Sequence, residues 1–241
     1  MQTTSALYNT ILADSNHWFE TKLVINGVDY AEDKLFSVNG KYRVFGAEQP
    51  TVGGCISGEL EVKMIMPSVE IPRMETVRPY VRATNGTQTS EWLPQGVFFI
   101  DTRETTHNGN GLDILTLHCY DAMLKAEADY PSSSHSWPYS DKNTVKEIAY
   151  AMGLQASISA SSGIDSRTLT LMNKNYQIAL PVGYSMREVL GNIAAMYAGN
   201  WIMNYDGKLR LVTLTELPEE TNYLVDQTYS PITFGGDRIL V

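Results

Sequence analysis

The stretch Glu-Leu-Glu-Val-Lys-Met-Ile-Met at residues 59–66 decides the fold of this chain. Charged and apolar side chains alternate along it, which is typical of a β-strand with one hydrated face and one buried face. Pro67 ends the strand. Residues 77–83 repeat the alternation with arginines on the outward face, and Pro79 predicts that this second strand lies at a sheet edge or a bulge.

Turn signals on both sides of residues 59–66 divide the N-terminal half into short strands. Asn and Asp tolerate positive φ and Gly prefers it, so Asn-Gly and Asp-Gly pairs fit the two-residue turns of antiparallel hairpins. Such pairs lie at Asn26-Gly27, Asn39-Gly40, Asn85-Gly86, Asn108-Gly109 and Asp206-Gly207. With a last strand at residues 112–120, the first half is predicted to hold about seven strands in a barrel or sandwich.

After Asp121 the periodicity changes from that of a strand to that of a helix. The most secure helix begins at Ser185, which forms a capping box with Glu188, and its apolar stripe runs to Tyr197. The other predicted elements are a short helix at residues 122–127, a helix at 144–152 with a Thr144–Glu147 capping box, a strand at 169–172 and a hairpin at 201–212. This order predicts a small α+β module.

We therefore predict a mainly β, α+β chain in three parts. Residues 1–121 form an antiparallel β-barrel with an N-terminal arm, and residues 122–220 form the α+β module. Residues 221–241 begin a second, incomplete barrel, because residues 232–234 and 238–241 resemble strands with no partner behind them.

Bulk composition restricts the function classes. With 43% hydrophobic and 19% charged residues, the 241-residue chain is an ordinary globular protein without a membrane-spanning apolar run or a visible secretion signal. Its net charge of -9 argues against tight, non-specific binding to nucleic acid. The acidity is that of a solvated surface or, alternatively, that of a passage through which DNA moves without binding.

No catalytic, cofactor or metal site is predicted, and the chain is expected not to be an enzyme. The four histidines show no metal-binding spacing, and Cys55 and Cys119 form neither a disulfide framework nor a metal motif. His118 and Cys119 are adjacent in a strand, so they face opposite ways and cannot form a catalytic pair.

A series of motifs then follows one order along nearly the whole chain. They lie at residues 58–66, 77–82, 93–103, 115–123, 144–149, 184–194 and 201–212. In this order they resemble the N-terminal, hub-forming part of phage tail-tip proteins, the baseplate hub or tail-associated lysin family. The hub of contractile tails and the type VI spike proteins look similar. The most characteristic pair is Gly-Val-Phe-Phe-Ile-Asp at residues 96–101 and Tyr-Asp-Ala-Met at residues 120–123.

The resemblance implies a structural protein of the virion tail that is assembled in the cytoplasm of the bacterial host. In that family the hub is a homotrimer in which each subunit supplies two related barrels. The resulting ring joins the six-fold tail tube to a three-fold tip and lets DNA pass. The implied partners are the distal tail protein, the tape measure and the tube, with no cofactor, no sequence-specific nucleic acid and no membrane segment.

The resemblance also gives candidate contact residues, because subunits of a ring present different patches to each other. The candidates are the aromatic residues Tyr80, Trp92, Phe98 and Phe99, placed in the core or an interface, and the charged residues Glu59, Glu61 and Lys63, facing a neighbour or the lumen. Two alternatives stay open: a cell-wall-directed enzyme fragment, and a carbohydrate-binding adhesion module that uses exposed aromatics such as Trp92 or Trp137.

Overall fold

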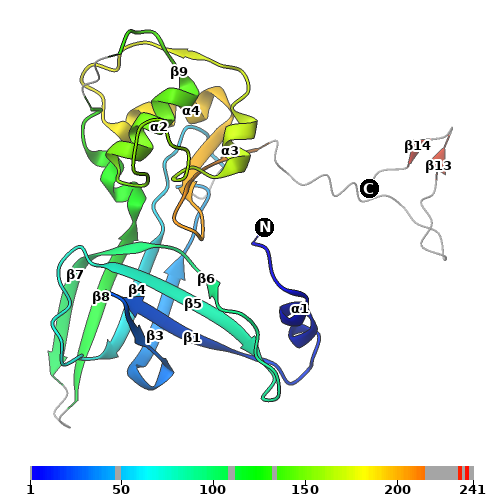
Figure 1. Ribbon diagram of the computed structural model, residues 1–241, viewed down its shortest axis with the longest axis vertical. Helices are drawn as coiled ribbons and strands as arrows, with labels where there is room; N and C mark the ends of the chain where they lie inside the picture. Colours follow the sequence, from blue (N-terminus) through cyan, green and yellow to red (C-terminus); the bar gives the residue numbers. More distant parts are fainter. Residues whose placement is uncertain are drawn as a thin grey trace.

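The structure is a computed structural model that describes residues 2–46, 50–107, 112–131 and 135–214, and the strand residues 233–234 and 237–238. A curled antiparallel sheet and a smaller α+β module are stacked along the long axis (Figure 1). Each of them has its own cluster of buried hydrophobic side chains. The mainly β, α+β class is confirmed.

The large sheet holds eight antiparallel strands in the order β2-β1-β5-β7-β8-β4-β3, with the short β6 paired to β5. Their bounds are β1 Trp18–Ile25, β2 Val28–Tyr30, β3 Leu35–Lys41, β4 Glu59–Ile65, β5 Thr76–Thr84, β6 Leu93–Pro94, β7 Phe98–His107 and β8 Asp113–Asp121. The alternation predicted for residues 59–66 is confirmed, because Leu60, Val62 and Met64 are buried while their neighbours face outward.

The sheet is open, so the closed barrel of the sequence prediction is not found in the described chain. β2 and β3 are the two ends of the strand order, and only residues 31–34, with the 3-10 turn η1 at Glu32–Lys34, separate them in sequence. The two sheet edges therefore approach each other at that corner, and the sheet curls. No ladder joins β2 to β3 among these residues.

The predicted turns have mixed outcomes. Asn26-Gly27 joins β1 to β2 with both residues at positive φ, and Asn85-Gly86 and Asp206-Gly207 are also turns. The turn predicted at Asn39-Gly40 is wrong, because these two residues lie within β3 opposite Glu61 and Leu60. The pair Asn108-Gly109 lies outside the described residues.

Pro79 does not lie at a sheet edge, because β5 lies between β1 and β7, but the predicted bulge is supported by a one-residue shift of register at this point. β5 pairs with β7 only at Thr76 and Val77, and with β6 only at Tyr80 and Val81. Pro79 occupies the interruption between those two pairings, where its carbonyl accepts a hydrogen bond from Gln95 N at 2.9 Å. The missing N–H of proline faces that interruption, so no ladder bond is lost.

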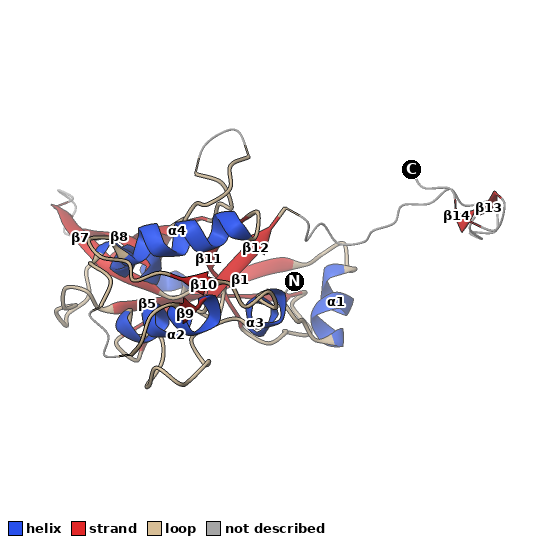
Figure 2. Ribbon diagram, turned by 90° about the horizontal axis from the view of Figure 1, so that it is seen from above, coloured by secondary structure: helices blue, strands red, loops and turns tan. Residues whose placement is uncertain are grey.

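The α+β module packs its helices around the hairpin of β11 and β12. Figure 2, seen from above, shows these helices overlying the strands of the large sheet. Its elements are η2 Ala122–Glu127, β9 Tyr139–Ser140, α2 Asp141–Ala151, α3 Ser166–Leu171, β10 Gln177–Ile178, α4 Met186–Met196, β11 Gly199–Met203 and β12 Leu209–Thr213. Trp201 is fully buried at the centre, and its indole N–H donates to Leu190 O at 2.8 Å.

The capping box of Ser185 and Glu188 at the start of α4 is confirmed. The predicted box of Thr144 with Glu147 is wrong, because Ser140 caps α2 one turn earlier and the Thr144 hydroxyl donates to Ser140 O at 3.0 Å. The strand predicted at residues 169–172 is also wrong. These residues belong mostly to α3, whose first turn is capped by Asp165. A short apolar run does not distinguish a strand from a short helix, so the pattern alone did not reveal this cap.

Two short elements lie near the ends of the chain. The N-terminal arm contains the helix α1, Ala6–Leu12, of which only Ile11 is buried. Near the C-terminus, β13 Thr233–Phe234 pairs with β14 Asp237–Arg238. The other residues assigned to a second barrel at 221–241 lie outside the described chain, so that domain and the boundaries at 121 and 220 stay predictions.

Leu117 on β8 is fully buried in the core of the sheet, whereas Leu112 just before the same strand is 49% exposed. We expect Leu117→Ala to lower the free energy of unfolding by about 2–5 kcal/mol, because it removes buried methyl groups and leaves a cavity. The matched variant Leu112→Ala should cost less than about 1 kcal/mol. Urea unfolding followed by circular dichroism measures both, and equal losses would contradict this description of the core.

Candidate functional site

The sheet and the module meet at a junction that the chain crosses more than once. Between β3 and β4, the described parts of residues 42–58, which are 42–46 and 50–58, leave the sheet, reach the module and return. On the way they add a parallel segment to β11, since Trp201 N donates to Gly54 O and Ile56 N donates to Trp201 O, each at 2.8 Å. A segment from the N-terminal half therefore completes the sheet of the module.

Asp121, the last residue of β8, holds this junction together. Its buried carboxylate accepts hydrogen bonds from Gly58 N at 2.6 Å, Ser57 Oγ at 3.0 Å and Met123 N at 2.9 Å. Burial raises the pKa of this carboxyl, and the three donors oppose the rise. A Cβ at Gly58 would lie 2.9 Å from Asp121 Oδ2, so only glycine leaves room for these bonds.

Arg187 at the start of α4 forms a second connection across the junction. Its guanidinium pairs with Glu127 Oε1 at 2.6 Å, and it donates to Met123 O at 3.2 Å and to Cys55 O. One side chain thus ties α4 to η2 and to the returning segment of residues 42–58. Together, Asp121 and Arg187 fix how the two cores are placed at this point.

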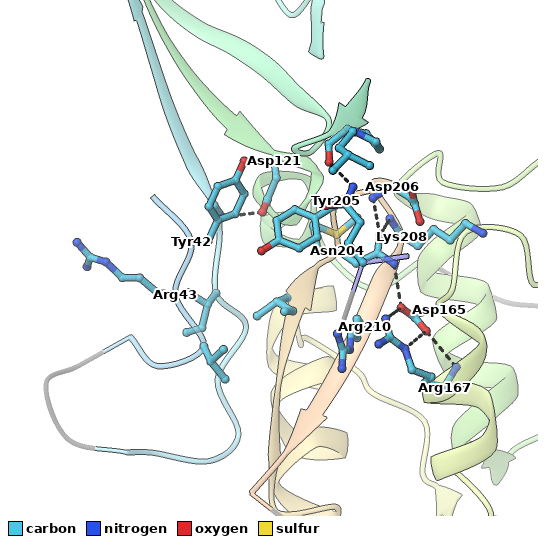
Figure 3. Close-up of a pocket in the computed structure, with 18 of the residues that line it drawn as sticks. Tyr42, Arg43, Asp121, Asp165, Arg167, Asn204, Tyr205, Asp206, Lys208 and Arg210 are labelled. Atoms are coloured by element: carbon cyan, nitrogen blue, oxygen red, sulfur yellow. Dashed lines mark hydrogen bonds and ion pairs between the residues drawn. The ribbon is translucent and has the colours of Figure 1, made fainter. Parts of the chain in front are cut away.

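A cleft of about 880 Å³ opens at the junction (Figure 3). Residues 42–44, β6, the β11–β12 hairpin and the start of α3 all contribute to its walls. The N-terminal arm reaches it as well, since Gln2 and Thr3 are lining residues. Its charged lining residues are Arg43, Asp121, Asp165, Arg167, Asp206, Lys208 and Arg210.

Asn204 and Asp165 organise one side of the cleft, as Figure 3 shows. Asn204 Oδ1 accepts from Asp206 N at 3.0 Å and Lys208 N at 2.9 Å, and Asn204 Nδ2 donates to Asp165 Oδ2 at 2.9 Å. The Arg167 guanidinium forms a two-point pair with Asp165, at 3.0 and 2.7 Å. Mainly because of these bonds, the pKa of Asp165 lies well below its ordinary range.

Aromatic residues form the opposite rim. The rings of Tyr42 and Tyr205 meet edge to face with centroids 5.6 Å apart, and Tyr42 also contacts the buried Phe98 at 6.0 Å. The Tyr42 hydroxyl donates to Gln95 O. Burial raises the pKa of Tyr42, so its phenol stays neutral across the ordinary pH range.

The arrangement at the cleft is suited to binding. Its buried carboxylates are engaged, Asp121 with backbone and hydroxyl donors and Asp165 with Arg167 and Asn204. The cysteines lie elsewhere in the cores, where burial raises the pKa of both thiols to about 12. Within the described ranges, no three His, Cys, Asp or Glu side chains gather as metal ligands, and no helix has the length and apolarity to span a membrane.

The charged candidates Glu59, Glu61 and Lys63 share the outward face of β4, away from the cleft. Glu59 pairs with Lys41 at 3.4 Å, and Glu61 lies 3.5 Å from Lys63 and 3.8 Å from His118 Nδ1. His118 thus faces outward while Cys119 is buried, as predicted for adjacent strand residues.

The aromatic candidates do not form one cluster. Tyr80 and Trp92 are half-buried and share one cation, because Lys22 Nζ lies 5.6 Å from the Tyr80 ring centroid and 5.1 Å from that of Trp92. The Arg82 guanidinium lies 4.3 Å from the Trp92 ring centroid. Phe98 is 1% exposed in the sheet core. Phe99 is half-buried with Lys125 Nζ 4.0 Å from its ring. Their role in an interface stays a prediction.

Sequence reasoning missed the cleft. Asp165 and Arg167 lie at the end of a serine-rich stretch, where the sequence does not indicate that Asp165 caps a helix. Arg43 follows a predicted strand and belongs to no motif. Only the Asp206-Gly207 turn indicated the hairpin that carries Asn204 and Lys208. The lining residues come from widely separated parts of the chain, so their proximity depends on the fold rather than on any local pattern.

No protein-family model matches the chain, and no curated protein matches it significantly. Among solved structures it is similar to the 43 kDa tail protein of prophage MuSo2 from Shewanella oneidensis. The TM-score is 0.52 at 12% sequence identity, and the match covers 81% of this chain and 53% of that one. The chain shares the fold of a prophage tail protein. It spans about half of that protein's length.

Two further structures are reported for comparison. The tail protein from Neisseria meningitidis MC58 gives a TM-score of 0.48 at 11% identity, over 89% of this chain and 53% of that one. The Francisella PdpA-VgrG complex gives a TM-score of 0.47 at 6% identity, over 82% of this chain and 31% of that one.

The pairing of Asp165 has a pH-dependent consequence. Because its pKa is depressed in the folded chain, the stability it contributes is present above its ordinary pKa of 3.8 and is lost as the pH falls below that value. We expect Asp165→Asn to lower the free energy of unfolding by about 1–3 kcal/mol at pH 7. Urea unfolding at a series of pH values should show the difference from the unmodified chain shrinking in acid.

The matched control is Asp206→Asn, an exposed carboxylate in the β11–β12 turn on the same side of the cleft, which should change the free energy of unfolding by less than about 0.5 kcal/mol. A loss for Asp165→Asn that stays constant from neutral to acid pH would contradict the ion-pair explanation.

Proposed function

We propose that the chain is a structural component of the tail tip of a phage or prophage. The observation that carries the proposal is the fold shared with the MuSo2 tail protein over 81% of this chain. The motif order of the sequence supports the same class. The junction adds support, because its charged side chains are bonded to backbone groups and to one another in the manner of a structural scaffold.

Within this proposal, three copies form a hub ring that joins the tail tube to the tip, in the virion tail. The distal tail protein, the tape measure and the tube would be its neighbours, and assembly would take place in the host cytoplasm. The outward face of β4 supplies a hydrated surface with both charge signs, through the pairs Lys41–Glu59 and Lys63–Glu61. A net charge of -9 would let DNA pass the ring without binding to it.

One observation favours the carbohydrate-binding alternative. A second, shallower groove of about 530 Å³ is lined by Tyr139, Tyr150, Asn143 and Lys146, and Tyr150 is 45% exposed. Exposed aromatic rings beside amide and ammonium groups are suited to stacking on a sugar and bonding its hydroxyls. Oligosaccharide binding that is abolished by Tyr150→Ala would support this alternative, whereas the hub proposal does not require it.

The oligomeric state tests the ring. Light scattering on a sizing column should give a mass near three times the 26.9 kDa of one chain as the protein concentration rises. We expect Glu61→Lys to shift the equilibrium toward the single chain, because it reverses a charge at the predicted contact. The matched variant Asp33→Lys, at an exposed site on η1, should leave the mass unchanged.

A mass of one chain at every concentration would refute trimer formation by this chain. The structural role has a separate test, antibody labelling of phage particles from the encoding strain in the electron microscope. Antibody labelling at the tail tip would support the proposal. Detection of the protein in the lysate together with particles that carry no label would overturn it.

A further inference from the structure

We propose that His135 and Glu147 form a proton-dependent latch, which holds residues 135–140 against α2 while the imidazole is charged. The inference rests on the side chains around these two residues, so it is independent of the tail role. It bears on the shallower groove of about 530 Å³, because Tyr139 belongs both to the held segment and to the lining of that groove.

The anchor of the latch is a buried carboxylate. Glu147 lies on α2, and its side chain is 5% exposed. His135 Nε2 lies 3.0 Å from Glu147 Oε2, and the Tyr130 hydroxyl donates to the same oxygen. Burial and the hydrogen bond to this carboxylate raise the pKa of Tyr130, so the phenol keeps its proton and remains a donor. A buried carboxylate needs such donors, because its burial is otherwise costly.

The two ring nitrogens of His135 both face oxygen atoms that can only accept a hydrogen bond. Nε2 faces the carboxylate of Glu147, and Nδ1 lies 3.3 Å from Ser136 O. A neutral imidazole has one N–H, so it can donate to only one of these acceptors. The doubly protonated ring donates to both and forms an ion pair with Glu147. The surroundings therefore fit the charged form of His135 better than the neutral form.

Aromatic rings lie against the same imidazole. The Tyr139 ring is stacked on it with centroids 3.6 Å apart, and the Trp137 ring lies tilted with its centroid at 4.7 Å. The faces of aromatic rings attract a cation, and more strongly where water is excluded. The His135 side chain is 24% exposed, so part of its hydration is already replaced by these rings. Protonation of His135 therefore strengthens the contacts that join Trp137 and Tyr139 to Glu147.

The charged and titratable groups around His135 come from three segments. α2 supplies Glu147, β9 supplies Tyr139, and the residues that follow η2 supply Tyr130. Lys146, also on α2, lines the shallower groove together with Tyr139. Histidine is the side chain whose charge ordinarily changes between pH 5 and 8. The latch stabilises the fold while the imidazole carries its second proton, and this contribution is lost as the pH rises and the ring becomes neutral.

Backbone relaxation of the chain of residues 1–241, measured by nuclear magnetic resonance at pH 5.5 and at pH 8.5, tests the latch. The amides of residues 135–140 should be as rigid as those of α4 at the lower pH and more mobile at the higher pH. The transition should share its midpoint with the imidazole signals of His135. In His135→Phe, which also assigns those signals, the dependence on pH should disappear. Equal mobility of residues 135–140 at the two pH values would overturn the proposal.

A pair of variants separates the latch from an ordinary ion pair. Glu147→Gln keeps the shape of the side chain and removes its charge, so it should lower the melting temperature by about 3–6 °C more at pH 5.5 than at pH 8.5. The matched control is Glu127→Gln, because Glu127 pairs with Arg187, and an arginine stays charged over this range. The effect of the control should be the same at both pH values. An equal response of the two variants to pH would contradict the latch.

Discussion

The buried carboxylate of Asp121 is the constraint on which the arrangement of the two cores depends. It receives donors from the end of the returning segment and from the start of η2, and so it fixes where β4 begins and where β8 ends. Its removal would leave three largely buried donors without their acceptor, which costs more than the bonds themselves contribute. This arrangement restricts position 58 to glycine, because the close approach of Asp121 Oδ2 leaves no room for a side chain there.

The described parts of residues 42–58 connect the sheet to the module a second time, through hydrogen bonds to β11. Because Gly54 and Ile56 bond to Trp201, the module cannot leave the sheet without losing part of its own sheet. The buried Asn200 strengthens this attachment, since its side chain accepts from Gly54 N at 2.7 Å and donates to Thr51 O at 2.6 Å. The cleft therefore has one wall from each side of the junction, and these hydrogen bonds connect the two sides.

The periodic parts of this fold could be predicted from the sequence, and the parts that depend on distant partners could not. The alternation at residues 59–66 and the capping box at Ser185 are local signals, and the structure confirms both. Pro79 is tolerated in an interior strand because its nitrogen, which carries no hydrogen, faces the interruption between the β6 and β7 pairings, which no local pattern shows. Asn39-Gly40 misleads because pairing with β4 overrides the turn propensity of the pair. The cleft is beyond sequence reasoning for the same reason, since its residues meet only after residues 42–58 have crossed to the module.

The outward face of the sheet and the cleft carry different arrangements of charged and apolar side chains. On the sheet, cations lie beside carboxylates: Arg82 with Glu20 at 2.6 Å, and Lys63 with Glu61 at 3.5 Å. Exposed pairs of this kind add little stability, because water and salt already screen them. They instead keep the outward face hydrated and electrically balanced. At the cleft, charged side chains of both signs stand beside apolar ones such as Val44, Leu93 and Ile202. Two unlike surfaces on one chain are what a head-to-tail ring or a mixed assembly needs, because each contact then joins different patches rather than a patch and its copy.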